Sequence, residues 1–329
     1  MEPCETIDPL IQALLDPARH GKNVSAVTLV ETHISWVLLT GETALKIKKP
    51  VKLPFLDFSS LEARRRYCEE EIRLNRRLAP EIYLDVVPIG GTRDDPILDR
   101  EPAIDYAVRM REFPPEARLD RQVADGAVSA NDICGLAELI GEFHAELPAA
   151  PLDSDCGAVT EVVRSVEKNL IETAAAVPVN LGQESPVHRY IVEQGEQLSG
   201  ALNRRKRADA IKEGHGDLHL ENLVRWQDRI LPFDALEFDP QLRWIDVIDE
   251  TAFVVMDLMA HGAEGLAFTF LNRYLEVTGD YDGLAVLRYY LVHRALVRAK
   301  VRAIKAAQSD AVSVAQEAKP YLDLAEQLI

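Results

Sequence analysis

The sequence has little of what marks disulfide-rich, membrane-spanning or nucleic-acid-binding proteins. Its four cysteines are far apart and include no C-x-x-C pair, so neither a zinc site nor a disulfide framework is expected. No run of 18 apolar residues exists, so no membrane partner is expected. Acidic residues outnumber basic ones by 54 to 37, which gives a net charge of −17. Such a balance does not predict a nucleic-acid partner, which would need a basic surface.

Two further absences concern targeting and domain content. Met1 is followed by Glu2 and other residues that do not form a basic and apolar leader, which predicts no signal peptide and a cytoplasmic location. The sequence also lacks the P-loop motif G-x-x-x-x-G-K-[ST], so we expect no second nucleotide site of that kind. A chain of 329 residues, 47% of them hydrophobic, is long enough for two lobes with a sizeable core.

The most informative stretch runs from His215 to Asp234. It reads His-Gly-Asp-Leu-His-Leu-Glu-Asn-Leu-Val, then a short turn, then an apolar strand that ends at Asp234. Asn222 lies five residues after Asp217, and Asp234 lies seventeen residues after it. Phosphoryl transfer needs a carboxylate at the attacking hydroxyl. It also needs an amide oxygen and a second carboxylate at Mg²⁺, because hard cations prefer oxygen ligands. The spacing therefore predicts a phosphotransfer site.

This pattern resembles the catalytic loop of the aminoglycoside phosphotransferase and choline-kinase-like family, small-molecule kinases with a protein-kinase-like fold. The resemblance implies an α+β fold of two lobes, an N-terminal lobe with an antiparallel sheet and one helix, and a mainly helical C-terminal lobe. By position, Asp217 would be the catalytic base, and Asn222 and Asp234 would bind the metal. The cofactors implied are ATP and Mg²⁺, and the partner implied is a small-molecule acceptor.

The first third of the chain predicts strands at 24–31, 36–40 and 43–48. The loop before Ser35 has no glycine, unlike the phosphate loop of protein kinases, but backbone N–H groups near Ser35 would still offer a phosphate site. In the third strand, Lys46 and Lys48 share a face, because strand residues two apart point the same way. The resemblance gives Lys46 the phosphate-binding role and leaves Lys48 as its competitor.

A helix is predicted to follow these strands, with Ser59 as its N-cap and Glu62 completing a capping box. Glu71 falls on the apolar stripe of this helix. Burying an unpaired acid is costly, so a cationic partner is expected for it. The resemblance names Lys46 as that partner, and Glu70 is the alternative acid.

A strand over 104–113 ends at a pair of prolines. In the fold implied by the resemblance, this position is the hinge, so the lobes would be residues 1–113 and 114–329. The backbone of Arg111 to Phe113 would then hydrogen-bond adenine. An ordinary edge strand before a linker predicts the same sequence, so only the order along the chain favours the hinge.

Other predictions concern single elements and side chains. A short amphipathic helix is expected over residues 6–20, and His144 is expected to have a structural role. The basic run Arg204 to Arg207 is interpreted as solvated surface. Helices are expected over 159–175, 186–203, 263–277 and 283–307. Arginines on the last of these would either form a basic wall for an acidic acceptor or pair with the surplus acids, and we favour the pairs.

The segment after Asp234 resembles a poorly characterised bacterial branch of the same family, many of whose members carry a P-loop kinase domain after this one. Here Asp234 is followed by Ala-Leu, so the glycine of the kinase D-F-G motif is replaced. Glu237 and Asp239 are candidates for substrate contact. Glu250 opens a helix where the family has an aspartate, and it is interpreted as one helix-capping acid in place of another.

Three functions are compatible with these residues. The favoured one is transfer of the ATP γ-phosphoryl group to a hydroxyl of a small molecule. A protein kinase on the same scaffold is disfavoured because the segment between Asp234 and Asp249 is short. A nucleotide-binding pseudokinase or regulatory protein is the alternative from a different class, because the phosphate-loop glycines and the D-F-G glycine are missing. The acceptor, the choice between ATP and GTP, and the oligomeric state have no marker in the sequence.

Overall fold

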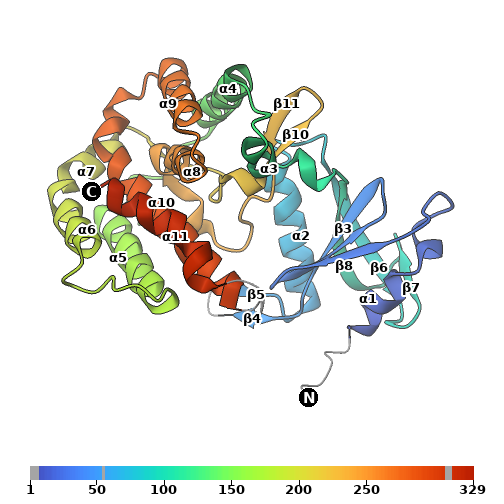
Figure 1. Ribbon diagram of the computed structural model, residues 1–329. Helices are drawn as coiled ribbons and strands as arrows, with labels where there is room; N and C mark the ends of the chain where they lie inside the picture. The colour runs from blue at the N-terminus through green and yellow to red at the C-terminus, as the bar shows by residue number, and fades with distance from the viewer. Residues whose placement is uncertain (1–6, 54–55, 308–312) are drawn as a thin grey trace. The chain divides into compact units, whose positions relative to one another are not determined.

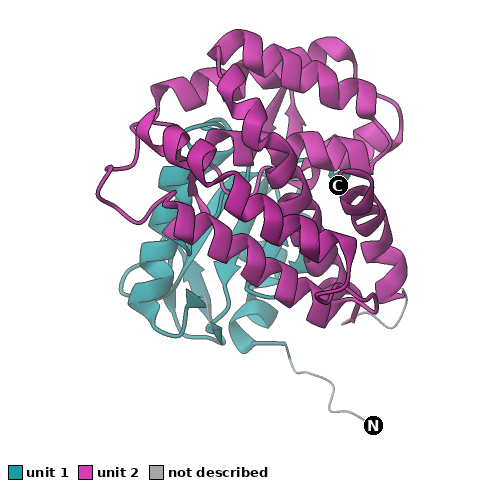
Figure 2. Cartoon of the chain, turned by 90° about the vertical axis from the view of Figure 1, so that its left-hand side faces the viewer, with its two compact units in different colours: residues 1–115, 232–239 teal, residues 116–231, 240–329 magenta. Residues whose placement is uncertain are grey.

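The structure is a computed structural model that describes residues 7–53, 56–307 and 313–329. The chain divides into two compact units (Figure 2): unit 1 comprises residues 1–115 and 232–239, and unit 2 comprises residues 116–231 and 240–329. The segment that carries Asp234 therefore belongs to unit 1, although it lies late in the sequence. The predicted mixed fold is confirmed, with an antiparallel sheet near the N-terminus and a helical region after it.

Unit 1 is built on a six-stranded sheet whose order is β1-β2-β3-β8-β6-β7, with every neighbouring pair antiparallel. Alternate apolar residues of β2, β3, β6 and β8 form a core with helix α1, while α2 packs against β8 and β6 (Figure 1). The predicted strand over 43–48 is β3, whereas the first strand is shorter than predicted. The strands are β1 (Thr28–Glu31), β2 (Ser35–Leu39), β3 (Thr43–Lys48), β6 (Tyr83–Gly91), β7 (Pro96–Leu98) and β8 (Ala103–Arg111), with a separate pair β4 (Lys52–Leu53) and β5 (Leu56–Asp57).

The helices of unit 1 correct two predictions. Helix α1 covers only Pro9–Leu14, and a separate 3₁₀ turn, η1 (Pro17–Arg19), follows it, because a proline at each start and an aspartate before it favour two short elements. Helix α2 covers Leu61–Asn75, and its N-cap is Ser60, whose Oγ accepts the Ala63 N–H at 3.1 Å. The predicted cap, Ser59, instead donates its hydroxyl to Asp57. The cap prediction was therefore wrong by one residue.

Unit 2 is organised around α8, an apolar helix in which twelve residues are buried. Helices α9, α10 and α11 all contact it. None of the helices in the described part of the chain has the length and apolar composition needed to cross a membrane. The helices are α3 (Leu119–Ala124), α4 (Ala130–Glu146), α5 (Val159–Ala176), α6 (Pro186–Gln197), α7 (Ser199–Arg207), α8 (Val247–Ala260), α9 (Glu264–Thr278), α10 (Leu284–Ala307) and α11 (Val314–Gln327). Four short strands form two ladders, β9 (Ile211–Glu213) with β12 (Trp244–Asp246) and β10 (Leu223–Trp226) with β11 (Arg229–Pro232). The 3₁₀ turns are η2 (Pro115–Ala117), η3 (Leu220–Asn222), η4 (Pro240–Leu242) and η5 (Tyr281–Gly283).

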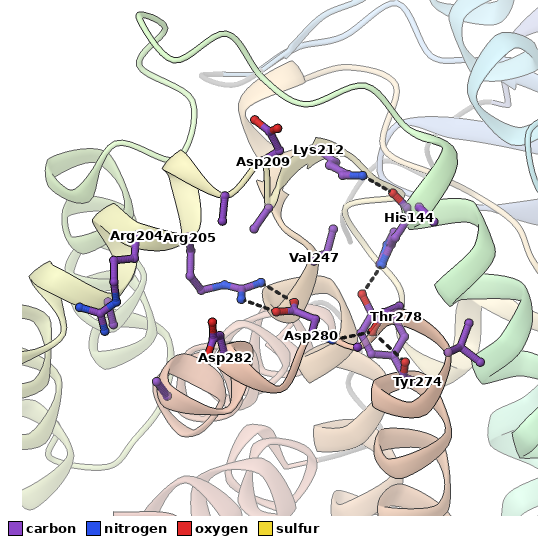
Figure 3. A pocket seen from close by; sticks show the side chains of 17 residues that line it. His144, Arg204, Arg205, Asp209, Lys212, Val247, Tyr274, Thr278, Asp280 and Asp282 are labelled. Atoms are coloured by element: carbon purple, nitrogen blue, oxygen red, sulfur yellow. Dashed lines mark hydrogen bonds and ion pairs between the residues drawn. The ribbon is translucent and has the colours of Figure 1, made fainter.

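The basic run at the end of α7 is only partly solvated, which corrects the predicted surface role. Arg205 is buried, and its guanidinium group donates to Asp246 and Asp280 at 2.6–2.7 Å. Two carboxylates offset the cost of removing the arginine from water. Arg205 and Asp280 line a cavity of about 470 Å³ in unit 2 that His144 also lines (Figure 3). The predicted helix over 186–203 is divided at Leu198 into α6 and α7.

Candidate active site

Strand β3 and helix α2 bring two lysines to one acid in unit 1. Lys46 Nζ lies 2.8 Å from Glu71 Oε1, and Lys48 Nζ lies 2.7 Å from Glu71 Oε2. Glu71 and Lys48 are fully buried. The alternative acid, Glu70, pairs with Arg73 on the more exposed side of the helix. The two lysines that compete in the sequence therefore share Glu71 in the structure.

The same cluster holds the segment that carries Asp234. Lys46 Nζ lies 2.5 Å from Asp234 Oδ1, and Lys48 pairs with Glu237. Asp234 adopts a φ of +62°, which is unfavourable for a residue with a side chain. Its N–H donates to Tyr83 Oη at 2.9 Å, and the next N–H, of residue 235, donates to the Asn75 side chain at 2.9 Å. These contacts stabilise the strained turn. Glu237, a candidate for substrate contact, is buried and pairs with Lys48.

This cluster contains more acidic than basic side chains. Burial lowers the pKa of Lys46, but Asp234 and Glu71 outweigh it, so the pKa stands well above its ordinary value. Burial also raises the pKa of Glu71, but the two lysines outweigh it and bring it to about 2. Burial raises the pKa of Glu237 above its ordinary value. With Lys48, the cluster has two ammonium groups and three carboxylates. Asp234 is the most exposed of these carboxylates, 44% by side chain, so it fits the coordination of a divalent cation.

The residues predicted to contact nucleotide differ in whether their backbone N–H groups already have a hydrogen-bond partner. The N–H of Ser35 donates to Thr32 Oγ1 at 3.0 Å, so this group is engaged. The N–H of Arg111 donates to the Ile82 carbonyl at 2.8 Å. The N–H of Phe113 has no hydrogen-bond partner among residues 7–53, 56–307 and 313–329, and its ring stacks edge-on against Phe233 at 5.0 Å between centroids. Phe113 therefore has the backbone donor that is open to a ligand.

In unit 2, Asp217 and Asn222 lie in the segment before β10 and are hydrogen-bonded to each other. Asn222 Nδ2 donates to the Asp217 carboxylate and to its carbonyl, at 3.0 Å each. His219 Nε2 lies 3.2 Å from the same carboxylate. Burial raises the pKa of Asp217, but His219 and Arg298 outweigh it and hold the pKa below its ordinary range. Asp217 is therefore ionised at neutral pH. Asn222 Oδ1 accepts no hydrogen bond from the described residues and is free to bind a cation.

Carboxylates from α8 hold the backbone of this loop. Glu250 Oε1 accepts the N–H groups of His215 and Gly216 at 2.6 Å each, and Glu250 Oε2 lies 2.7 Å from His144 Nε2. His144 Nδ1 in turn lies 2.8 Å from the hydroxyl of Tyr274, so the predicted structural role of this histidine is confirmed (Figure 3). The capping interpretation of Glu250 was wrong. Asp246 caps α8 through the Ile248 N–H, and Glu250 fixes the loop that carries Asp217.

The α10 arginines pair with acids, as the favoured interpretation predicts. Arg294 binds both oxygens of Asp249 at 2.7 and 2.9 Å, and Arg298 binds Glu221 at 3.0 Å. The sequence gives no signal for several contacts that shape the site, namely those of Tyr83 and Asn75 with the backbone of residues 234 and 235 and that of Asp257 with the Leu220 N–H. No group of three His, Cys, Asp or Glu side chains in the described residues is arranged as a metal site. Mg²⁺ commonly takes one or two protein carboxylates and completes its shell with phosphate and water.

The fold is the protein-kinase-like fold of small-molecule kinases. The chain superposes on APH(2″)-IIia in complex with GDP and kanamycin with a TM-score of 0.55, at 15% identity, covering 97% of this chain and 98% of that one. A choline/ethanolamine kinase family protein from Mesorhizobium loti gives 0.55, at 10% identity, covering 97% and 92%. A glucosamine kinase with glucosamine, ADP and inorganic phosphate gives 0.51, at 14% identity, covering 92% and 80%. The predicted resemblance is thus confirmed at the level of the fold.

Curated relatives exist among bacteria. Uncharacterized proteins of Mycobacterium tuberculosis and Mycobacterium bovis are 31% identical over 288 residues, which cover 84% of this chain and 55% of theirs. The chain spans about half the length of these relatives. No family model matches the chain.

Proposed function

We propose that this chain is a phosphotransferase that uses ATP and Mg²⁺ and transfers the γ-phosphoryl group to a hydroxyl of a small molecule. The observation that carries the proposal is the Lys46 ammonium group, which contacts both Glu71 and Asp234. A lysine between a helix acid and the acid after an apolar strand is the arrangement that phosphoryl transfer uses to bind phosphates beside a metal. The kinase-like fold supports the same reaction class.

The proposal gives the residues of unit 1 the task of binding the nucleotide. Lys46, oriented by Glu71, would bind the phosphates, and Asp234 would hold the metal. The backbone of Arg111 to Phe113 would bind adenine, chiefly through the open N–H of Phe113. Ser35 is the weakest member of this set, because its N–H is engaged by Thr32. Bound Mg-ATP would supply the phosphoryl group and neutralise its charge.

The proposal gives the loop of unit 2 the chemistry at the acceptor. Asp217 would accept a hydrogen bond from the attacking hydroxyl and orient it, because its depressed pKa keeps it ionised. A carboxylate of low pKa is a weak base, which suits a loose transition state in which the proton leaves late. Asn222 would offer its amide oxygen to the metal and holds Asp217 through its amide nitrogen. The partners crystallised with the structural neighbours, kanamycin and glucosamine, both carry hydroxyl groups, which supports this acceptor class.

The test is thermal unfolding with and without Mg-ATP. At a hundred times its dissociation constant, the ligand stabilises by about 2.7 kcal/mol, a shift of about 5 °C for a chain of this size. We expect this shift for the wild type and for Asp94→Ala, an exposed acid of unit 1, and its loss in Asp234→Ala. The absence of a Mg²⁺-dependent shift in the wild type would contradict the proposal.

A companion variant separates the enzyme from the pseudokinase alternative. Asp217→Asn keeps the shape of the loop but removes the charge that orients the acceptor. We expect it to retain the Mg-ATP shift and to lose ATP turnover by about a thousandfold, as for other general-base substitutions. Turnover measured by ADP release that is equal in both proteins would favour a nucleotide-binding regulator.

A further inference from the structure

Helix α11 reaches the catalytic loop of unit 2 through a buried acid. The hydroxyl of Tyr321, on α11, donates to Asp257 Oδ1 at 2.9 Å. The other oxygen of Asp257 accepts the backbone N–H of Leu220 at 2.8 Å. Asp257 is fully buried and Tyr321 is 4% exposed, so water does not compete for either bond. Leu220 begins the 3₁₀ turn η3 that ends at Asn222.

A second connection joins α10, and through it α11, to the same turn. The carboxylate of Glu221 accepts from Arg298 at 3.0 Å and from Arg302, both on α10. Arg302 also lies 3.6 Å from Glu317 of α11, and the Arg298 guanidinium lies 5.6 Å from the centre of the Tyr321 ring. Burial raises the pKa of Glu221, but Arg298 and Arg302 outweigh it and bring the pKa to about 2. Figure 1 shows α11 beside α10, and the two helices are in contact.

We propose that α11 positions the catalytic loop, and that Tyr321 and Asp257 are positioning residues for Asp217 and Asn222. The turn η3 connects these two residues, so fixing the Leu220 N–H fixes the direction in which Asn222 leaves the turn. Asn222 is hydrogen-bonded to the Asp217 carboxylate, so the orientation of Asn222 also affects that of Asp217. Hydrogen bonds to a buried carboxylate are stronger than those between neutral groups, so the bond to Asp257 constrains the backbone at Leu220. The catalytic meaning of this inference rests on the proposed function, whereas the structural contact does not.

The experiment compares Tyr321→Phe with Tyr289→Phe. Both remove one hydroxyl from a buried tyrosine of unit 2, but the Tyr289 hydroxyl has no hydrogen-bond partner in the described part of the chain. Amide hydrogen exchange is followed by mass spectrometry on the ligand-free protein, in peptides that cover residues 215–224. We expect Tyr321→Phe to speed exchange there about tenfold, the factor that corresponds to about 1.4 kcal/mol. Tyr289→Phe should leave these peptides unchanged.

Steady-state kinetics add the functional readout. With Mg-ATP alone, and water as acceptor, Tyr321→Phe should lower kcat about fivefold and change KM for ATP less than that, because Asn222 would be displaced while Lys46, Asp234 and Phe113 of unit 1 are intact. Equal exchange in both variants, or a change in KM alone, would overturn the inference. If the wild type shows no Mg-ATP effect in thermal unfolding, the proposed function fails, while the exchange comparison still decides whether α11 positions the loop.

Discussion

The two units hold their candidate residues by different means. In unit 1, the ion pairs of the cluster are between side chains: Lys46 and Lys48 share Glu71 and reach Asp234 and Glu237, and side chains also hold the N–H groups of residues 234 and 235. In unit 2, side chains bind backbone: Glu250 and Asp257 accept the N–H groups of residues 215, 216 and 220. A charge cluster depends on the residue type at both ends of every contact. A loop held by its backbone depends only on the type of the acceptor, since nearly every residue has an N–H. Substitutions should therefore have effects throughout the cluster of unit 1. In the loop of unit 2, the effects should be concentrated on Glu250 and Asp257.

The largest expected effect is loss of Lys48. Lys48→Met keeps most of the side-chain volume but leaves Glu237 buried without its lysine partner and Glu71 with one lysine instead of two. Removing one member of a buried pair costs about 3 to 5 kcal/mol, so we expect the free energy of unfolding to fall by about 3 kcal/mol. Urea denaturation measures this. Lys46→Met should cost less, because Glu71 keeps Lys48 and Asp234 is partly exposed.

The control for this pair is Lys52→Met, which breaks an ion pair with Asp57 at the surface. Exposed pairs of this kind contribute little, so no measurable change is expected. If the two buried lysines give equal losses, Asp234 depends on Lys46 as strongly as Glu237 depends on Lys48. In that case the cluster behaves as one unit, without a structural lysine distinct from the one that meets the ligand.

The backbone-held loop should show its own acid sensitivity. Burial raises the pKa of Glu250, but His144, His215 and the Gly216 N–H outweigh it and bring the pKa to about 2. The folded pKa lies below the unfolded one, about 4.3, so this contribution is complete above the unfolded pKa and is lost as pH falls towards 2. Between pH 5 and pH 3.5, the wild type should lose about 1 kcal/mol more than Glu250→Gln.

Denaturant unfolding of both proteins at pH 5, 4.25 and 3.5 gives this difference. A constant difference between them would mean that the charge of Glu250 is irrelevant to the loop and that only its shape counts. Glu71→Gln is the matched variant in unit 1, because burial opposed by its two lysines also gives Glu71 a pKa of about 2. It should share the pH window but cost more at neutral pH, since Lys46 and Lys48 each then lose a buried carboxylate partner.

The success of the sequence-based predictions also differs between residues in sequence motifs and contacts to the backbone. Asp217, Asn222 and Asp234 were identifiable because their types and spacing belong to one motif, whereas Lys46 and Glu71 were assigned through the resemblance, with Lys48 and Glu70 left as alternatives. The structure places Glu71 against Lys46 and Asn222 against Asp217. Their roles in catalysis stay predictions until nucleotide binding is measured.

What the sequence did not predict consists of contacts with no local pattern. Tyr83 supports the Asp234 backbone from 151 residues away, and Asp257 supports Leu220 from 37 residues away. Arg205 was interpreted as solvated because it stands in a basic run, and its partners Asp246 and Asp280 lie 41 and 75 residues away. Strand β3 was predicted well because alternation is local. The N-cap of α2 was missed because Ser59 and Ser60 are both suitable capping residues.

The smallest expected effect separates these two serines. Ser60→Ala removes the Oγ that accepts the Ala63 N–H and should lower the free energy of unfolding by about 0.5 to 1 kcal/mol. Ser59→Ala loses an exposed bond to Asp57 and should cost less. If side-chain contacts hold the cluster of unit 1, a frayed first turn of α2 should leave the Mg-ATP shift unchanged, because Glu71 and Asn75 lie at the other end of the helix. A Ser60→Ala protein that lost this shift would mean that the backbone of α2, like that of the loop in unit 2, sets the geometry of its site.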